Sequence, residues 1–278
     1  MRTRFAPSPT GPLHLGHAYS AILAHDMARA CGGEFLLRIE DIDQGRARPE
    51  WEDLISEDLA WLGLTWDGPV LRQSERLPAY SDALDRLWSA GLLFPCACSR
   101  RDIAEAASAP QEGAPIGPDG IIYPGTCRPS FPRSGPRPLD ANLRLDMARA
   151  ATDPVRFTET GCRLDEIAVP PEALISGTGD IVLARRDMGT SYHLSVVVDD
   201  AAQGITHVTR GEDLFEATPI HVLLQRLLGL PTPVYHHHRL IRDARGKRLA
   251  KRDDAKAIRT YREGGATPAD IRRMVGLG

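Results

Sequence analysis

The sequence has few cysteines, no internal repeat and no long apolar run. Five cysteines are an odd number, and a chain of 278 residues can bury a core without disulfides, so free thiols or metal ligands are expected instead. No uncharged run approaches the roughly 18 residues of a membrane-spanning helix, and no apolar segment follows the N-terminal arginines. These absences argue against a disulfide-stapled secreted domain and a membrane protein. We expect a folded cytoplasmic protein.

Charge is distributed unevenly along the chain. Residues 239–278 carry 12 Lys and Arg against 5 Asp and Glu, a net charge of +7, whereas the whole chain has a net charge of −3. A basic segment on an acidic body indicates contact with a polyanion, either nucleotide phosphates or a nucleic acid. A solvated helical face explains the same charges equally well, so charge alone leaves both interpretations open.

The first forty residues have the pattern of a strand, a loop and a helix followed by a second strand. Arg2–Phe5 is strand-like, a loop rich in proline and glycine follows, His17–Cys31 is helical, and Phe35–Ile39 is the next strand. This βαβ pattern predicts an α/β fold with a parallel sheet. Apolar residues at helical spacing predict further helices over 49–62 and 77–88.

The middle of the chain changes character. Eight prolines between residues 110 and 138 forbid long regular elements and imply an inserted, irregular subdomain. Strand-like segments then resume at 142–147, 155–158, 181–184, 194–198 and 206–209. The run Ser195–Val198 is apolar on both faces, which predicts a central parallel strand.

The motif His14-Leu15-Gly16-His17 lies between the first predicted strand and the first predicted helix. A helix N-terminus offers unpaired N–H groups and a positive dipole end to a phosphate, and Gly16 lets a nucleotide approach the backbone closely. The two imidazoles can donate to an α-phosphate. Alone, this string is a weak signal, because surface histidines near turns are common.

A second motif is the basic run Lys247–Arg252, which follows Asp243–Gly246. Mobile cations beside a triphosphate can neutralise the charge that develops in the transition state of adenylate formation. Considered in isolation, a solvated loop is the simpler interpretation of this run.

Together, in this order, the two motifs resemble the HIGH and KMSKS signatures of class I aminoacyl-tRNA synthetases. Further segments resemble the catalytic domain of glutamyl-tRNA synthetases, namely RFAPSPTG at 4–11, RIED at 38–41, YHLSVVVDD at 192–200 and GITHVTRGED at 204–213. The resemblance extends from residue 4 to about residue 252 and implies a Rossmann-type domain that uses ATP with Mg²⁺. In the second signature, Ala250 stands in place of the usual serine.

The resemblance implies roles for individual residues. Two arginines, Arg4 and Arg210, are expected to hold the side-chain carboxylate of glutamate through charge-assisted, potentially bidentate hydrogen bonds. Glu40 and Tyr192 are expected to receive the α-ammonium group. The catalytic candidates are His14, His17 and Lys251, the further glutamate candidates are Phe5, Ala6, Pro7 and Ser8, and the ATP candidates are His14, Gly16, His17, Arg248, Leu249 and Lys251.

Cys96, Cys98 and Cys127 are a candidate metal site. Three soft thiolates in a reduced compartment suit a structural Zn²⁺ ion, which prefers four tetrahedral ligands. No histidine lies between Cys96 and Cys127, so Tyr123 is the candidate fourth ligand, and the pattern is similar to that of a short glutamyl-tRNA synthetase relative. Three free thiols are the alternative. The other two cysteines, at positions 31 and 162, are predicted to be buried small residues.

Only 26 residues follow Arg252 in the 278-residue chain, too few for the helical anticodon-reading domain of a full glutamyl-tRNA synthetase. The chain therefore resembles the truncated paralogues that activate L-glutamate and attach it to the queuosine base in the anticodon loop of tRNA(Asp). The implied partners are ATP, L-glutamate and queuosine-containing tRNA(Asp), and a monomer is expected. Three alternatives stay open: a truncated enzyme acting on the acceptor end of tRNA(Glu), a nucleotidylyltransferase, and a noncatalytic RNA-binding module.

This interpretation predicts four regions. They are a first Rossmann-fold half over 1–92, a zinc-binding insert over 93–140, a second Rossmann-fold half over 141–235, and the KMSKS-like loop with a short helical segment over 236–278.

Overall fold

The computed structural model describes residues 1–107, 114–130, 133–242 and 256–278. Its N-terminal part is the predicted βαβ unit, made of β1 (Arg2–Phe5), α1 (Leu15–Ala30) and β2 (Glu34–Ile39). β1 and β2 run parallel, and the short β3 (Leu71–Arg72) extends this sheet, again in parallel. Helix α2 (Pro49–Trp61) begins at a proline, whose fixed φ suits the first turn.

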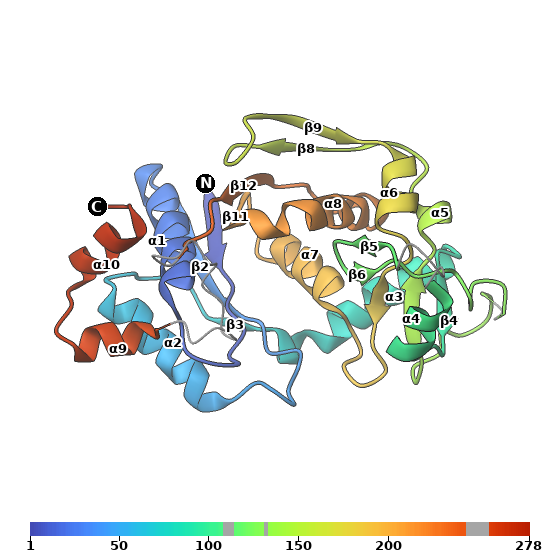
Figure 1. The fold of residues 1–278 in the computed structure, drawn as a ribbon, viewed down its shortest axis with the longest axis horizontal. Coiled ribbons are helices and arrows are strands. Elements are labelled where there is room, and N and C mark those ends of the chain that lie inside the picture. Colours follow the sequence, from blue (N-terminus) through green and yellow to red (C-terminus); the bar gives the residue numbers. More distant parts are fainter. Residues whose placement is uncertain (108–113, 131–132, 243–255) are drawn as a thin grey trace.

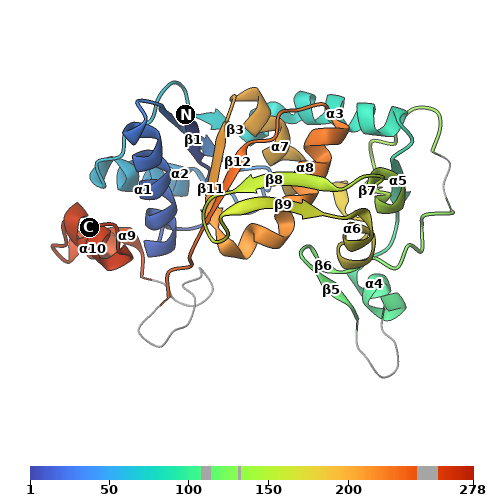
Figure 2. The same cartoon turned by 90° about the horizontal axis from the view of Figure 1, so that it is seen from above.

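A second sheet continues the fold beside the first. Its strand order is β11 (His207–Gly211), β12 (Val234–His238), β8 (Val155–Glu159) and β9 (Asp165–Val169). The first three strands are parallel, whereas β8 and β9 form an antiparallel hairpin. The amide of Thr206 donates to the carbonyl of Arg2 at 3.0 Å, so β11 lies next to β1 (Figure 2).

The predicted strand over residues 194–198 is wrong, because these residues belong to helix α7 (Tyr192–Ala202). Three consecutive valines favour a strand, and the segment is apolar on both faces. The helix lies among α3 (Leu77–Ser89), α8 (Thr218–Leu227) and the second sheet, and it is buried almost all round (Figure 1). A helix buried on all sides loses the amphipathic period that distinguishes it from a central strand.

The insert occupies one end of the elongated molecule, and the C-terminal helices occupy the other (Figure 1). Its strand β4 (Leu93–Cys96) is the edge of an antiparallel sheet in the order β10 (Val182–Ala184), β7 (Asn142–Leu145) and β4. The other two strands come from the chain after the predicted insert, so this end of the molecule extends beyond residues 93–140. Around this sheet lie α4 (Arg100–Ala107), the β5 (Ile116–Gly117) and β6 (Gly120–Ile121) hairpin, α5 (Met147–Ala150) and α6 (Pro171–Gly177). The C-terminal helices are α9 (Ile258–Glu263) and α10 (Pro268–Val275).

The two largest apolar clusters of the described residues hold most of these parts together. The larger one lies between the second sheet and helices α3, α7 and α8, and the other lies where α1, α2 and β2 meet. Helix α10 packs on α1 and is tied to it by the ion pair between Arg272 and Asp26, at 2.6 Å. Within the described residues, none of the helices has the length and apolar character needed to cross a lipid bilayer.

Candidate active site

The histidines of the first motif form the start of helix α1. The Gly16 amide donates to Nδ1 of His14 at 3.1 Å, and the His14 amide donates to Nδ1 of His17 at 3.2 Å. In a neutral imidazole whose Nδ1 accepts, the proton is on Nε2. Each ring therefore has an Nε2–H donor at the helix N-terminus, where the dipole favours an anion.

Gly16 has a further role that the sequence did not suggest. A Cβ atom at this position would lie 2.9 Å from Cε1 of His14, so a side chain here would displace the ring. The glycine thus makes room for the histidine, in addition to the close approach of a nucleotide that the motif predicted.

Arg248, Leu249 and Lys251 of the second motif lie outside the described residues, but the segments on both sides of it contact the α1 region. Ahead of it, Ser20 Oγ lies 2.6 Å from His238 Nε2. Behind it, Ala257 forms a bridge with His14, and the Ile258 amide donates to the Leu13 carbonyl at 2.8 Å. The chain is thus beside α1 at His238 and Ile241, and it is beside the N-terminus of α1 at Ala257.

The predicted glutamate residues separate into two groups. Ser8, Glu40 and Tyr192 line a cavity of about 350 Å³, together with Arg100 and Arg185. Phe5 and Pro7 are buried, Ala6 between them is half-buried, and the Glu40 amide donates to the Pro7 carbonyl at 3.0 Å. Arg4 and Arg210 are buried and do not line this cavity, but both charges act on the Tyr192 phenol. Burial raises the pKa of the Tyr192 phenol, which is therefore a neutral donor.

Arg4 belongs to a buried ionic network. Its Nε lies 3.0 Å from Asp200 Oδ1, and Arg38 Nη1 lies 2.6 Å from the same oxygen. Nη2 of Arg38 reaches Glu40 Oε1 at 3.1 Å. Burial alone would lower the pKa of the Arg38 guanidinium, but Asp200 and Glu40 outweigh it and raise that pKa. Burial raises the pKa of Glu40, because its carboxylate is poorly solvated. A cation that enters the cavity would therefore be attracted to this carboxylate.

Arg210 is held by hydrogen bonds to uncharged groups. Its Nε donates to His237 Nε2 at 3.1 Å, its Nη1 to His221 Nδ1 at 2.9 Å, and its Nη2 to Thr218 Oγ1 at 2.7 Å and to the Leu214 carbonyl at 3.3 Å. Among the described residues, no carboxylate lies within 4.0 Å of this guanidinium, although Arg210 is only 6% exposed. A buried cation without a counterion favours an incoming anion.

Two carboxylates fix the histidines around Arg210. Nδ1 of His237 donates to Glu159 Oε2 at 2.5 Å, which leaves Nε2 as the acceptor for Arg210. On the other side, His221 Nε2 lies 3.0 Å from His193 Nδ1, and His193 Nε2 lies 3.3 Å from Asp119 Oδ1. Burial and the Arg210 charge lower the pKa of His237 to about 4, so this ring is neutral near pH 7.

The three cysteines of the predicted metal site lie together at the end of β4. Cys98 Sγ and Cys127 Sγ are 3.3 Å apart, and Tyr123 Oη is 3.5 Å from both Cys96 Sγ and Cys98 Sγ. Sulfur ligands of a tetrahedral Zn²⁺ lie about 3.8 Å apart for Zn–S bonds of about 2.3 Å, so the donors fit this ion. Arg144 supports anionic ligands here, because its Nε lies 3.3 Å from Cys96 Sγ and its Cζ 4.0 Å from the Tyr123 ring centre.

The prediction that Cys31 and Cys162 are buried is wrong, because both are exposed. Cys31 caps the C-terminus of α1 in a turn before two glycines, and Cys162 lies in the turn between β8 and β9. Both positions are in turns, which lie on the surface whatever the side chain prefers.

Several residues of the site were not predicted from the sequence. Arg38 and Asp200 lie inside the RIED and VVVDD segments, and an arginine and an aspartate in otherwise apolar surroundings could have signalled a buried pair. The three histidines at 236–238 come at the end of β12, beside the predicted clamp residue. Glu159 and Asp119 had no signal of this kind, because only the fold brings them near these histidines.

Comparison with known proteins gives one consistent family. The protein-family model described as class I tRNA synthetases (E and Q), catalytic domain, matches residues 1–277 of this chain. The glutamyl-Q tRNA(Asp) synthetase of Rhodobacter capsulatus is 69% identical over 279 residues, which cover 100% of both chains. The glutamyl-Q tRNA(Asp) synthetase of Geobacter sulfurreducens is 44% identical over 94% of this chain and 78% of its own.

Solved structures agree on the fold. A glutamate tRNA ligase from Elizabethkingia meningosepticum, in complex with its amino acid, superposes with a TM-score of 0.80 at 29% identity. The present chain is covered completely and spans 61% of that enzyme. Mycobacterium tuberculosis methionyl-tRNA synthetase bound by methionyl-adenylate gives a TM-score of 0.62 at 12% identity over 99% of this chain and 63% of its own, a likeness of fold alone.

Proposed function

Because the chain belongs to the catalytic-domain family of class I glutamyl- and glutaminyl-tRNA synthetases, we propose that it activates L-glutamate with ATP and transfers it to the queuosine base in the anticodon loop of tRNA(Asp). The observation that carries this proposal is the 69% identity over the full length of a glutamyl-Q tRNA(Asp) synthetase. Transfer to the acceptor end of tRNA(Glu) is the alternative, and the names of the relatives do not favour it.

In the first step, an oxygen of the glutamate α-carboxylate attacks the α-phosphorus of Mg·ATP. The bond to the β-phosphate oxygen breaks, and glutamyl-adenylate and pyrophosphate form. His14 and His17 donate through Nε2 to the phosphates at the N-terminus of α1. Arg248, Leu249 and Lys251 are proposed to bind ATP as well, and Lys251 to neutralise the departing phosphates; the contacts of the flanking segments with α1 support this assignment.

Glutamate is recognised through its charges. The α-ammonium group binds at Glu40 and Tyr192 in the cavity of about 350 Å³, and the side-chain carboxylate lies toward Arg210 and Arg4. The four hydrogen bonds that Arg210 already makes leave one of its five N–H groups for the substrate. We therefore expect a single hydrogen bond from Arg210 to the substrate, whereas the sequence led us to expect potentially bidentate contacts from both arginines; the paired face of Arg4 already contacts Asp200.

In the second step, a hydroxyl of the queuosine cyclopentenediol attacks the carbonyl of the mixed anhydride. The ester forms, AMP leaves, and the hydroxyl proton goes to the phosphate side of the leaving group or to water. No covalent enzyme intermediate is needed, so the protein contributes position and electrostatic stabilisation.

We also propose that Cys96, Cys98, Tyr123 and Cys127 bind one structural Zn²⁺ ion. Such an ion would hold together the region from 93 to 140, which has a small core of its own around Phe94. Metal analysis should find about one zinc per chain in the wild type and in Cys31→Ser, and a loss in Cys98→Ser. If a chelator removes the zinc and the melting temperature stays the same, the structural role of the ion is contradicted.

The wider expectations follow from this reaction. We propose that the four regions 1–92, 93–140, 141–235 and 236–278 act as one catalytic unit, that the protein is a cytoplasmic monomer, and that one chain acts on one tRNA. The single catalytic centre and the single RNA partner support this view.

The test of the proposed function is dependence on queuosine. Labelled glutamate and ATP are incubated with the protein and with bulk tRNA from cells that make queuosine or lack it. We expect acid-precipitable label with the first tRNA and background with the second. Equal labelling of both preparations would favour the tRNA(Glu) acceptor end and overturn the proposal.

A further inference from the structure

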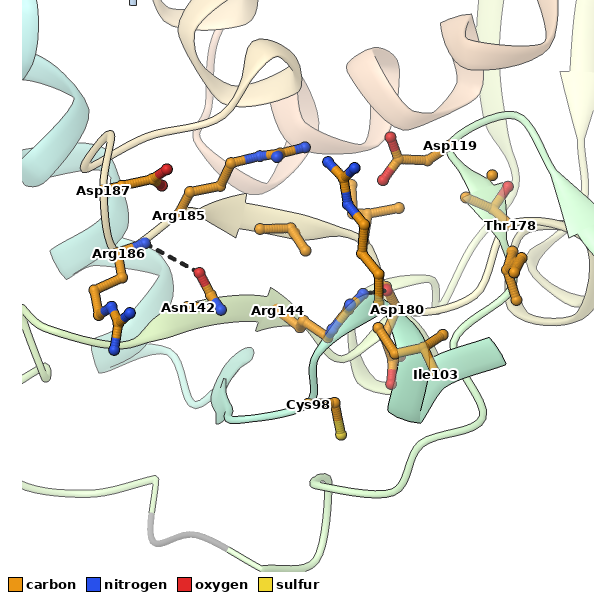
Figure 3. A pocket seen from close by; sticks show the side chains of 15 residues that line it. Cys98, Ile103, Asp119, Asn142, Arg144, Thr178, Asp180, Arg185, Arg186 and Asp187 are labelled. Carbon is orange, nitrogen blue, oxygen red and sulfur yellow. Dashed lines mark hydrogen bonds between the residues drawn. The ribbon is translucent and has the colours of Figure 1, made fainter. Parts of the chain in front are cut away.

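A second, larger cavity of about 580 Å³ lies beside the glutamate cavity and has no role in the chemistry above. Its walls come from α4, the β5–β6 hairpin, β7, β10 and the loop that follows β10 (Figure 3). Its volume falls within the roughly 300–1,000 Å³ of pockets that bind small organic molecules. A single nucleotide is of this size class.

The cavity presents positive charge that the protein does not neutralise. Among the described residues, the guanidinium groups of Arg100, Arg185 and Arg186 have no hydrogen-bond or ion-pair partner. Arg185 extends toward Asp119, whereas Arg186 turns to the opposite side of the same loop (Figure 3). The Arg186 amide donates to Asn142 Oδ1 at 3.0 Å, so the loop that carries both arginines is anchored to β7.

Two of the three acidic residues of this cavity already have a partner. Asp180 forms an ion pair with Arg128 at 2.7 Å, and Asp119 accepts from His193 at 3.3 Å. Asp187 lies at the side of the cavity away from Asp119 (Figure 3). The unpaired arginines therefore outnumber the unpaired carboxylates, which favours an anionic ligand.

The two cavities adjoin one another. Arg100 and Arg185 line both of them, whereas Arg186 lines the larger one only. A ligand in the larger cavity is therefore a neighbour of a glutamyl group in the smaller one. This is the position of an accepting polynucleotide, since the accepting hydroxyl must reach the activated carboxyl group.

We propose that Arg100, Arg185 and Arg186 bind phosphodiester groups of the RNA next to the accepting nucleotide, and that the larger cavity receives one nucleotide of the loop. The inference rests on the proposed function, because it places the RNA beside the activated glutamate. Single-stranded loops are the form of RNA whose bases can be splayed into a pocket. Arginine suits the contact, because its planar fork matches phosphate oxygens.

The test measures RNA binding, which needs no reaction. The probes are anticodon stem-loops of tRNA(Asp) with queuosine or with guanosine at the modified position, and their dissociation constants are measured by fluorescence anisotropy over a series of KCl concentrations. One lost phosphate contact should weaken binding by Arg186→Ala about fivefold at about 0.1 M salt and reduce the salt slope by about 0.7. The loss should be equal for both RNAs, because phosphates carry no base identity.

Matched variants separate this contact from general charge. Arg101→Ala removes the same charge from α4, but Arg101 already pairs with Glu105 at 2.7 Å and does not line the cavity, so binding should change little. Arg186→Lys should keep most of the salt slope. Glutamate affinity should be unchanged in Arg186→Ala.

Other outcomes would overturn the inference. If Arg101→Ala and Arg186→Ala weaken RNA binding equally, the effect comes from the overall positive charge of the protein and not from a phosphate contact in the cavity. If the loss of binding is limited to the RNA with queuosine, Arg186 contacts the base instead of a phosphate. If wild-type protein binds both stem-loops but transfers no glutamate, the proposed function fails, while the binding data still decide whether the arginines contact phosphate.

Discussion

Glu159→Gln should weaken glutamate binding without touching the cavity, because it reverses the tautomer of a neighbouring histidine. Oε1 of Glu159 accepts from the amides of Gly161 at 2.7 Å and His237 at 3.0 Å, so a glutamine must place its carbonyl oxygen there. Its NH₂ group then faces Nδ1 of His237, which must accept. The proton moves to Nε2, where it meets the Nε–H of Arg210.

The size of the effect follows from this lost contact. A hydrogen bond to a charged group is worth about 1.5–3 kcal/mol, and part of its loss should appear as lower stability. If most of this free energy is lost because Arg210 no longer keeps its position for the substrate, KM for glutamate should rise roughly tenfold or more in the pyrophosphate-exchange assay. KM for ATP should be unchanged, because the histidines of the α1 N-terminus are not involved.

A matched control is Glu166→Gln, in the same hairpin but exposed, which pairs with Arg156 at 3.5 Å. It should leave both KM values unchanged. If Glu159→Gln lowers stability yet leaves KM for glutamate at the wild-type value, Glu159 supports only the fold and has no role in positioning Arg210.

Further predictions concern pH, the helix start and the second motif. Burial lowers the pKa of His221 and His237 in the folded protein, so both rings take up a proton more readily in the unfolded chain. The free energy of unfolding should therefore be constant above about pH 6.5 and should fall below it, by up to about 1.4 kcal/mol per pH unit for each ring. Thermal denaturation between about pH 7 and pH 5 measures this decrease. Gly16→Ala should displace the His14 ring and raise KM for ATP, although alanine gains about 1 kcal/mol of helix propensity, so the melting temperature should change little. Lys251→Ala should slow adenylate formation roughly a hundredfold or more in rapid-quench experiments and leave glutamate affinity nearly intact; unchanged pyrophosphate exchange would refute its role.

The elements with a clear local pattern could be predicted from the sequence. The βαβ unit, the helix that begins at Pro49 and the strand at 155–158 are confirmed, because each has a distinct hydrophobic period and turn residues at its ends. Helix α7 could not be predicted in this way, since burial on all sides removes the period. The family was reached through motifs, which depend on chemistry rather than on periodicity.

The site was predicted as a set of residues but not as an arrangement. Nothing in the spacing of Arg4 shows that Asp200 occupies its paired face, nor that Arg210 is held by two neutral histidines. These contacts join residues that are up to 196 positions apart, so they depend on the completed fold. The larger cavity was missed for the same reason, because its arginines come from α4 and from the loop after β10.

The most direct test of the account is the position of the glutamyl ester on the RNA. Purified tRNA(Asp) and tRNA(Glu) from a queuosine-making cell are incubated with labelled glutamate, ATP and the protein, then digested with nuclease, and the labelled fragments are identified by mass spectrometry. We expect an alkali-labile ester on the queuosine nucleotide of the tRNA(Asp) anticodon loop. Label on the 3′-terminal adenosine of tRNA(Glu) would contradict it.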